Sequence, residues 1–85
     1  MTRLMLVDDH AVVRTGLRML IEGEADLEIA GEAETASEAI NLIGRLKPDV
    51  VLMDIGLPDM SGIEATRNIK MIAPETAVVA LTIHE

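Results

Sequence analysis

The sequence predicts an α/β fold in which a parallel sheet is doubly wound, with helices on both faces. Short apolar segments alternate with longer segments of helical periodicity, in the order strand, helix, strand, helix, strand, helix, strand along 85 residues. Most of the short segments are continuous apolar runs, which is typical of parallel strands covered on both faces. With right-handed crossovers, the simplest arrangement of four such strands is the order 2-1-3-4.

The predicted strands are residues 4–7, 27–33, 50–53 and 77–81. The second strand alternates acidic and small or apolar residues, as expected for an edge strand with one face partly wet. The fourth strand is apolar throughout and resembles a doubly buried strand, yet the predicted order leaves it at the other edge. We therefore expect something to cover it, either a missing fifth strand with its helices or a partner chain.

The predicted helices lie between these strands. The first runs from about residue 11 to residue 21 and stops at Gly23, whereas the capping-box patterns Thr35-x-x-Glu38 and Ser61-x-x-Glu64 begin the others. Lys47-Pro48 and Pro74 end the second and third helices. The residues expected on the buried stripes are Val13, Leu17, Leu20, Ile21, Ala36, Ala39, Ile40, Ile43, Leu46, Ala65, Ile69 and Ile72.

Composition indicates one globular domain with an unusual core. Hydrophobic residues make up 49% of the chain and charged residues 26%. Because Phe, Tyr and Trp are absent, the core has to be aliphatic, with methionines 5, 19, 53 and 71 expected as core filler. Cysteine is also absent, which excludes disulfides and thiolate metal sites.

Charge and hydropathy exclude several classes of partner. The net charge is −8 and the seven basic residues are scattered, so we expect this chain to bind no nucleic acid. The N-terminal apolar run is too short for a signal peptide or a membrane span, so we expect no membrane association and a cytoplasmic protein.

Three carboxylates follow two of the predicted strands. Asp8 and Asp9 come directly after the first strand and Asp54 directly after the third. Ligands of open parallel sheets bind where the winding direction reverses, here between these strands, so the three side chains should converge. A hard divalent cation such as Mg²⁺ would neutralise them. Taken alone, Asp9 is also explained as a helix cap, but Asp54 is not, because the next helix begins only near residue 61.

These residues resemble the receiver domain of two-component response regulators. The match rests on Asp8-Asp9, on Asp54-Ile55-Gly56-Leu57-Pro58 with Gly62, and on Leu81-Thr82, and it extends along the whole chain. The segment His10-Ala-Val-Val-Arg-Thr-Gly-Leu is most similar to the NarL/LuxR subfamily. The resemblance implies a flavodoxin-like (CheY-like) fold. Receiver domains are already known for the strand order 2-1-3-4-5, so the predicted order is not independent support.

The resemblance also implies a role for each site residue. Asp54 would accept a phosphoryl group from the phosphohistidine of a sensor histidine kinase. Asp8, Asp9, Asp54 and the carbonyl of Gly56 would hold Mg²⁺, with Asp8 acting mainly through water. Thr82 would donate its hydroxyl to a phosphoryl oxygen as the switch, although a Thr that ends a strand is also explained by local backbone bonding. From its position, His10 is expected to be a solvated residue of the first helical turn.

The family pattern further implies segments that are not in this sequence. It places a lysine and an aromatic residue on a fifth strand and adds a fourth and a fifth helix, and we therefore expect residues 1–85 to be a partial receiver, truncated after the fourth strand. The missing part would include a helix-turn-helix DNA-binding domain for transcription regulation. The expected function is a phosphoacceptor, not an enzyme. The alternative is a phosphorylation-impaired fragment that forms homodimers or exchanges elements through the fourth strand.

Two other functions are disfavoured by the residues themselves. A magnesium-dependent phosphohydrolase with an aspartyl nucleophile needs Asp-x-Asp after the first strand, and Asp8-Asp9-His10 does not supply it. Nucleotide binding of the Rossmann type needs glycines in the first turn, where this chain has acids.

Overall fold

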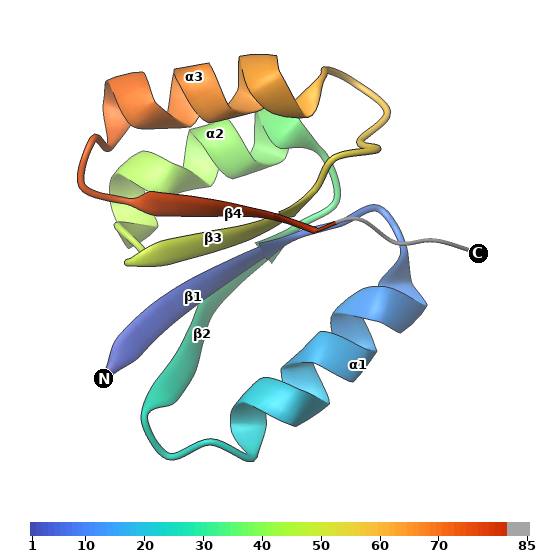
Figure 1. Ribbon diagram of the computed structural model, residues 1–85, viewed down its shortest axis with the longest axis vertical. Coiled ribbons are helices and arrows are strands. Elements are labelled where there is room, and N and C mark those ends of the chain that lie inside the picture. Colours follow the sequence, from blue (N-terminus) through green and yellow to red (C-terminus); the bar gives the residue numbers. More distant parts are fainter. Residues whose placement is uncertain (82–85) are drawn as a thin grey trace.

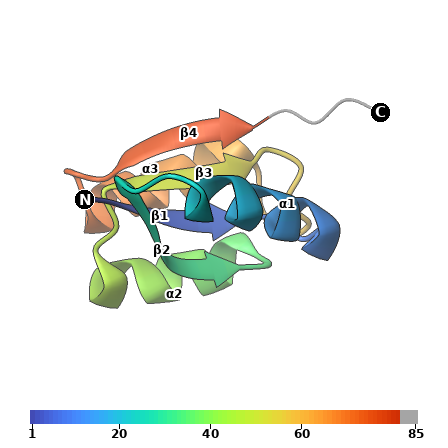
Figure 2. The ribbon, with the colours of Figure 1, turned by 90° about the horizontal axis from the view of Figure 1, so that it is seen from below.

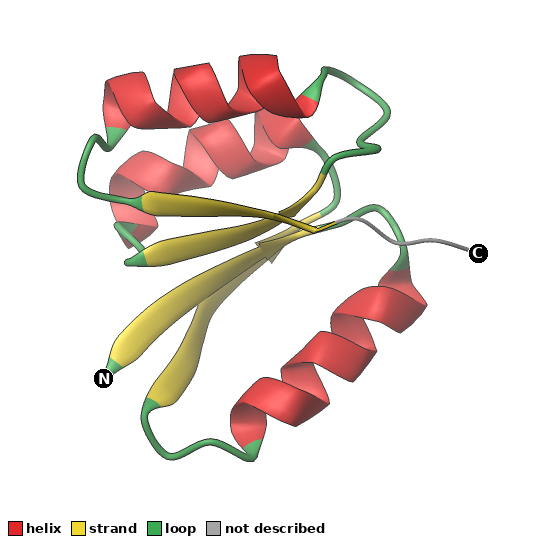
Figure 3. Cartoon of the chain, viewed as in Figure 1, coloured by secondary structure: helices red, strands yellow, loops and turns green. Residues whose placement is uncertain are grey.

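The computed structural model describes residues 1–81, which form four parallel strands and three helices (Figures 1 and 3). The sheet order is β2-β1-β3-β4, so the predicted α/β class and strand order are confirmed. The predicted strands lack only the first two residues of β1 and the last residue of β3. The elements are β1 Thr2–Val7, α1 Ala11–Glu22, β2 Leu27–Ala33, α2 Ala36–Leu46, β3 Val50–Asp54, α3 Gly62–Ile72 and β4 Ala77–Leu81.

Helices cover both faces of the sheet, α2 and α3 on one side and α1 alone on the other (Figures 1 and 3). Successive residues of β1 point to opposite faces. Met5 and Val7 pack in the larger core with α2 and α3, and Leu4 and Leu6 pack in the smaller core with Ile21 of α1. Burial on both faces explains why β1 is apolar throughout.

The two edges of the sheet are β2 and β4 (Figure 2). Within residues 1–81, β4 pairs only with β3, and its Val79 is 45% exposed. The edge position of this apolar strand is therefore confirmed, and no other described segment covers its outer side.

Four residues expected in the core are instead exposed. Leu20 and Met19 of α1 are 73% and 70% exposed, and Met71 and Ile72 of α3 are 82% and 49% exposed. The predictions were wrong because α1 covers its face alone and contacts the sheet through the narrow stripe of Leu17 and Ile21. The two α3 residues lie in its last turn, beyond the buried contact of Ile69. Met5 and Met53 are buried, as expected.

The predicted N-caps are present, and α2 has an additional one from outside the helix. The Thr35 hydroxyl accepts a hydrogen bond from the amide of Glu38, and that of Ser61 from the amide of Glu64, both at 3.1 Å. Asp59, in the loop after β3, accepts hydrogen bonds from the Ala36 and Ser37 amides at 3.0 and 2.9 Å. These bonds lower the pKa of Asp59 and tie that loop to the start of α2.

The helices of the described region, residues 1–81, are all shorter or more polar than a bilayer-spanning helix has to be.

Candidate functional site

Three carboxylates meet at the carboxyl-terminal edge of the sheet. Asp8 and Asp9 follow β1, and Asp54 ends β3, the strand that pairs with β1. One potential ligand atom from each of them, together with one from His10, lies within 4.8 Å of the others. The convergence predicted between the first and third strands is therefore confirmed.

The carboxylate of Asp8 is buried, and only one of its two oxygens accepts a hydrogen bond from residues 1–81. Asp8 is 1% exposed, and its Oδ1 accepts hydrogen bonds from the amide and Nδ1 of His10, at 2.8 and 2.9 Å. Its Oδ2 is buried and has no hydrogen-bond partner among residues 1–81. A buried oxygen without a partner is costly and rare in proteins. A divalent cation with oxygen ligands would supply the missing partner, so the donor set fits such an ion.

Asp54 is oriented by the loop that follows it. It is 6% exposed, and its Oδ1 accepts a hydrogen bond from the amide of Gly56 at 3.0 Å. This bond within the turn limits rotation of the carboxylate. The contact found for Gly56 is thus through its amide, and the role of its carbonyl as a metal ligand stays a prediction.

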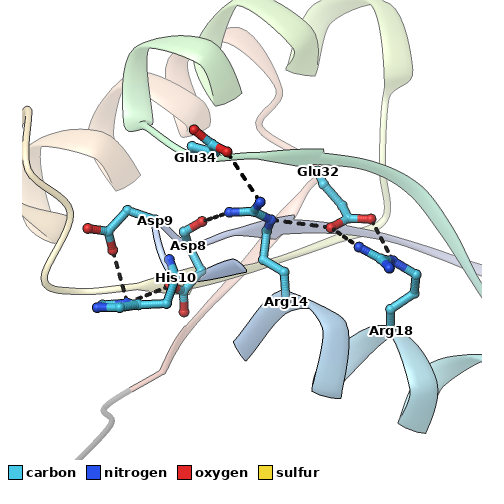
Figure 4. Close-up of polar contacts among 7 residues, drawn as sticks. All are labelled: Asp8, Asp9, His10, Arg14, Arg18, Glu32 and Glu34. Atoms are coloured by element: carbon cyan, nitrogen blue, oxygen red, sulfur yellow. Dashed lines mark hydrogen bonds and ion pairs between the residues drawn. The ribbon is translucent and has the colours of Figure 1, made fainter. Parts of the chain in front are cut away.

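His10 borders the acidic cluster, and its side chain is 59% exposed, so the expectation that it is solvated is confirmed, although it precedes the first turn of α1. It is the N-cap of α1, without a side-chain capping bond, and its Nδ1 lies 3.1 Å from Asp9 Oδ1 (Figure 4). The same nitrogen lies 3.8 Å from Asp54 Oδ2. The hydrogen bond that the His10 ring donates to Asp8 raises the pKa of His10, with a further contribution from the charge of Asp9. Adjacency to the Asp8-Asp9 pair was the only sequence signal for this placement.

Thr82 lies outside the described residues, so its role stays a prediction. The residue before it, Leu81, pairs with Asp54, and its carbonyl accepts a hydrogen bond from the amide of Ile55 at 3.3 Å. The end of β4 therefore lies beside the end of β3.

Behind the cluster lies an ion-pair network that the sequence did not reveal. Arg14 of α1 donates a hydrogen bond to the backbone carbonyl of Asp8 and contacts Glu32 and Glu34, each at 3.3 Å (Figure 4). Arg18 donates two hydrogen bonds to Glu32, both at 2.9 Å. Glu32 and Glu34, at the end of β2, are thus paired with arginines of α1. The sequence indicated this only weakly, through the spacing of the two arginines by one helical turn, which places them on the same face of α1.

The Arg18–Glu32 pair predicts an acid-sensitive contribution to stability. Its hydrogen bonds lower the pKa of Glu32 below the ordinary value of 4.5. The contribution is therefore fully present above pH 4.5 and is lost as the pH falls through the lower pKa of the folded chain. Glu32→Gln should cost about 0.5–1 kcal/mol of unfolding free energy at neutral pH, the upper range for partly exposed ion pairs, and less in acid.

Urea unfolding across a pH series, followed by circular dichroism, measures this difference. Glu28→Gln is the matched control on the same strand, since Glu28 is 48% exposed at its side chain and lies 3.6 Å from Arg3 Nε. A difference between wild type and Glu32→Gln that stays constant into acid would contradict the assignment.

Comparisons with known proteins are consistent with this geometry. A family model described as "Response regulator receiver domain" matches residues 4–85. The transcriptional regulatory protein YdfI of Bacillus subtilis is 45% identical over 82 residues, which cover 96% of this chain and 38% of YdfI. The chain spans about two fifths of the length of the curated relatives that it matches.

Solved structures give the same result. A LuxR-family two-component response regulator from Aurantimonas sp. superposes with a TM-score of 0.90 at 43% identity, over 100% of this chain and 61% of that one. The isolated REC domain of RcsB from Salmonella enterica, solved in the presence of the phosphomimetic BeF₃⁻, superposes with a TM-score of 0.90 at 26% identity, over 99% of this chain and 63% of that one.

Proposed function

Because this chain belongs to the response regulator receiver domain family, with relatives of the NarL/LuxR type, we propose that it accepts a phosphoryl group on Asp54 from a sensor histidine kinase. Asp8, Asp9 and Asp54, with the Gly56 carbonyl, would hold Mg²⁺. The observation that carries the proposal is the convergence of three carboxylates around a buried oxygen of Asp8 that has no hydrogen-bond partner in the described part of the chain.

The chain's own residues have distinct tasks in this reaction. The Asp54 carboxylate attacks phosphorus, a P–O bond forms as the P–N bond of the phosphohistidine breaks, and the departing imidazole takes a proton from solvent. The Gly56 amide orients the Asp54 carboxylate. Bound Mg²⁺ would offset the charge on the transferring phosphoryl group. Thr82 would donate its hydroxyl to a phosphoryl oxygen. The phosphoryl group ends on the protein itself, so the chain is a phosphoacceptor and not an enzyme for an external substrate.

The relatives suggest the wider setting. YdfI is named a transcriptional regulatory protein, and this chain covers 38% of it. We propose that the parent protein regulates transcription through a DNA-binding domain outside this sequence and works in the cytoplasm.

The direct test is phosphorylation by a small donor. The chain is incubated with phosphoramidate, with and without Mg²⁺, and its intact mass is followed over time. We expect one added phosphoryl group per chain, dependent on Mg²⁺, that maps to Asp54 after borohydride reduction. Label on another residue, or no label from a chain that binds Mg²⁺, would refute the proposal.

The exposed edge of the sheet favours a second candidate function, self-association. On the α1 face, Val79 of β4 is uncovered. On the α3 face lies an open groove of about 550 Å³. The groove residues are Met53, Ile55, Ser61, Gly62, Ile63, Thr66, Arg67 and Ala80. A second copy of this chain that pairs through β4 would bond the edge that is free within residues 1–81 and would cover the apolar side chains of this groove.

Val79→Lys is expected to abolish such a dimer, because a charge on an edge strand opposes pairing. Sedimentation velocity over a concentration series should show a monomer–dimer equilibrium for wild type and a monomer for the variant. Val12→Lys is the control, since Val12 lies on α1 and is 85% exposed. A wild-type chain that stays monomeric at every concentration would exclude this second function.

A further inference from the structure

Arg14 connects three elements behind the acidic cluster. It belongs to α1, donates to the backbone carbonyl of Asp8 at the end of β1, and reaches Glu32 and Glu34 at the end of β2 (Figure 4). Its side chain is only 13% exposed although it is charged. The N–H donors of a guanidinium lie in one plane and point in fixed directions. The contacts with the glutamates therefore orient the Arg14 side chain and, through it, the carbonyl group that it binds.

The carbonyl that Arg14 binds belongs to the peptide that joins the two acidic residues Asp8 and Asp9. Because the peptide bond is planar, holding the Asp8 carbonyl also holds the amide of Asp9. On the other side, the Asp8 amide donates to the carbonyl of Ala33 at 3.0 Å, so the backbone of Asp8 is fixed at both ends. A change of ψ at Asp8 or of φ at Asp9 would change the direction of the two carboxylates relative to one another.

The network adds no net charge to the site. The charges of Arg14 and Arg18 are matched by those of Glu32 and Glu34, which the arginines contact. A purely electrostatic role for Arg14 would weaken cation binding, since its positive charge repels a divalent ion. A positioning role would strengthen cation binding. Removal of the Arg14 charge should therefore strengthen cation binding if the role is purely electrostatic and weaken it if Arg14 positions the ligands.

We propose that Arg14 is a positioning residue for the divalent-cation site: its guanidinium, braced by Glu32 and Glu34, holds the Asp8 carbonyl and so aims the Asp8 and Asp9 carboxylates at Asp54. This inference rests on the proposed function, because it deepens the role of the same site. Mutation of a group that orients a metal ligand typically lowers metal affinity by about 10- to 100-fold.

The test is Mg²⁺ binding by isothermal titration calorimetry at fixed pH, since the chain has no aromatic residue to report binding by fluorescence. Arg14→Met removes the charge and the fork, and Arg14→Lys keeps the charge but loses the fork. Both variants should weaken Mg²⁺ binding by about tenfold. Arg18→Met is the matched control, because it removes the same charge from α1 and a contact to Glu32 but none to Asp8. It should stay within about twofold of wild type.

The outcomes separate the alternatives. Wild-type affinity in Arg14→Lys with tighter binding in Arg14→Met would show that only charge matters and would overturn the inference. A wild-type chain that binds no Mg²⁺ would overturn the proposed function and this inference with it. If Arg14→Met fails to fold, Arg14→Lys decides through its amide NMR spectrum without metal. There the signals of Asp8 and Asp9 should shift in the folded variant, and unchanged signals would refute the positioning role.

Discussion

Replacement of Asp54 by Asn should eliminate phosphorylation by phosphoramidate and leave the fold unchanged. The amide is not a nucleophile toward phosphorus, so no acyl phosphate can form. The carbonyl oxygen of the amide still accepts the hydrogen bond that Gly56 donates to Asp54 Oδ1, so the local loop is preserved. Intact mass spectrometry should therefore detect no phosphoryl addition, with a wild-type circular dichroism spectrum.

The control for this variant is Asp26→Asn. Asp26 is an exposed carboxylate before β2, at the opposite edge of the sheet from the acidic cluster, and its side chain makes no hydrogen bond within residues 1–81. This variant should be labelled like wild type. Persistent labelling of Asp54→Asn would place the phosphoryl group on a different residue and would end the assignment of Asp54.

Asp8→Asn should have two opposite effects, loss of Mg²⁺ binding and gain of stability without Mg²⁺. Within the described residues 1–81, the buried Oδ2 of Asp8 has no hydrogen-bond partner, and the Asp8 carboxylate lies near two others. Without a cation this arrangement is unfavourable, and a neutral amide removes the charge and can donate to a neighbouring carboxylate. Relief of a buried, unsatisfied polar group is worth about 1 to 3 kcal/mol.

Urea unfolding in EDTA and in Mg²⁺ measures both effects. Wild type should gain stability with Mg²⁺, because a ligand that binds only the folded chain stabilises it, and Asp8→Asn should not respond. Asp9→Asn provides the comparison, since the Asp9 side chain is 34% exposed and its carboxylate is better solvated, so the gain in EDTA should be smaller. If Asp8→Asn were less stable than wild type in EDTA, the buried oxygen would have a partner that the geometry does not show.

Local patterns predicted most of the fold because they are tied to backbone geometry. Continuous apolar runs marked β1, β3 and β4, and capping residues marked the starts of α2 and α3. Periodicity failed for Leu20, because it says which residues share a helix face but not how wide a contact the neighbouring sheet offers.

The acidic site was predicted in part. Asp8, Asp9 and Asp54 were found from strand ends, since parallel strands bring their carboxyl ends to one edge. The cap that Asp59 places on α2 was missed, because it depends on where a loop lies relative to a distant element.

Sequence alone determined the order of elements, the two-sided sheet and the positions of the three carboxylates, because strand and helix periods and strand ends are local properties of the chain. Tertiary structure alone decided which oxygen of Asp8 has no hydrogen-bond partner among residues 1–81 and which arginine holds its backbone. The physical reason is that hydrogen bonding and burial of a side chain depend on residues far away in sequence, as Arg14, Glu32 and Asp8 show, and no periodicity records the distance between them.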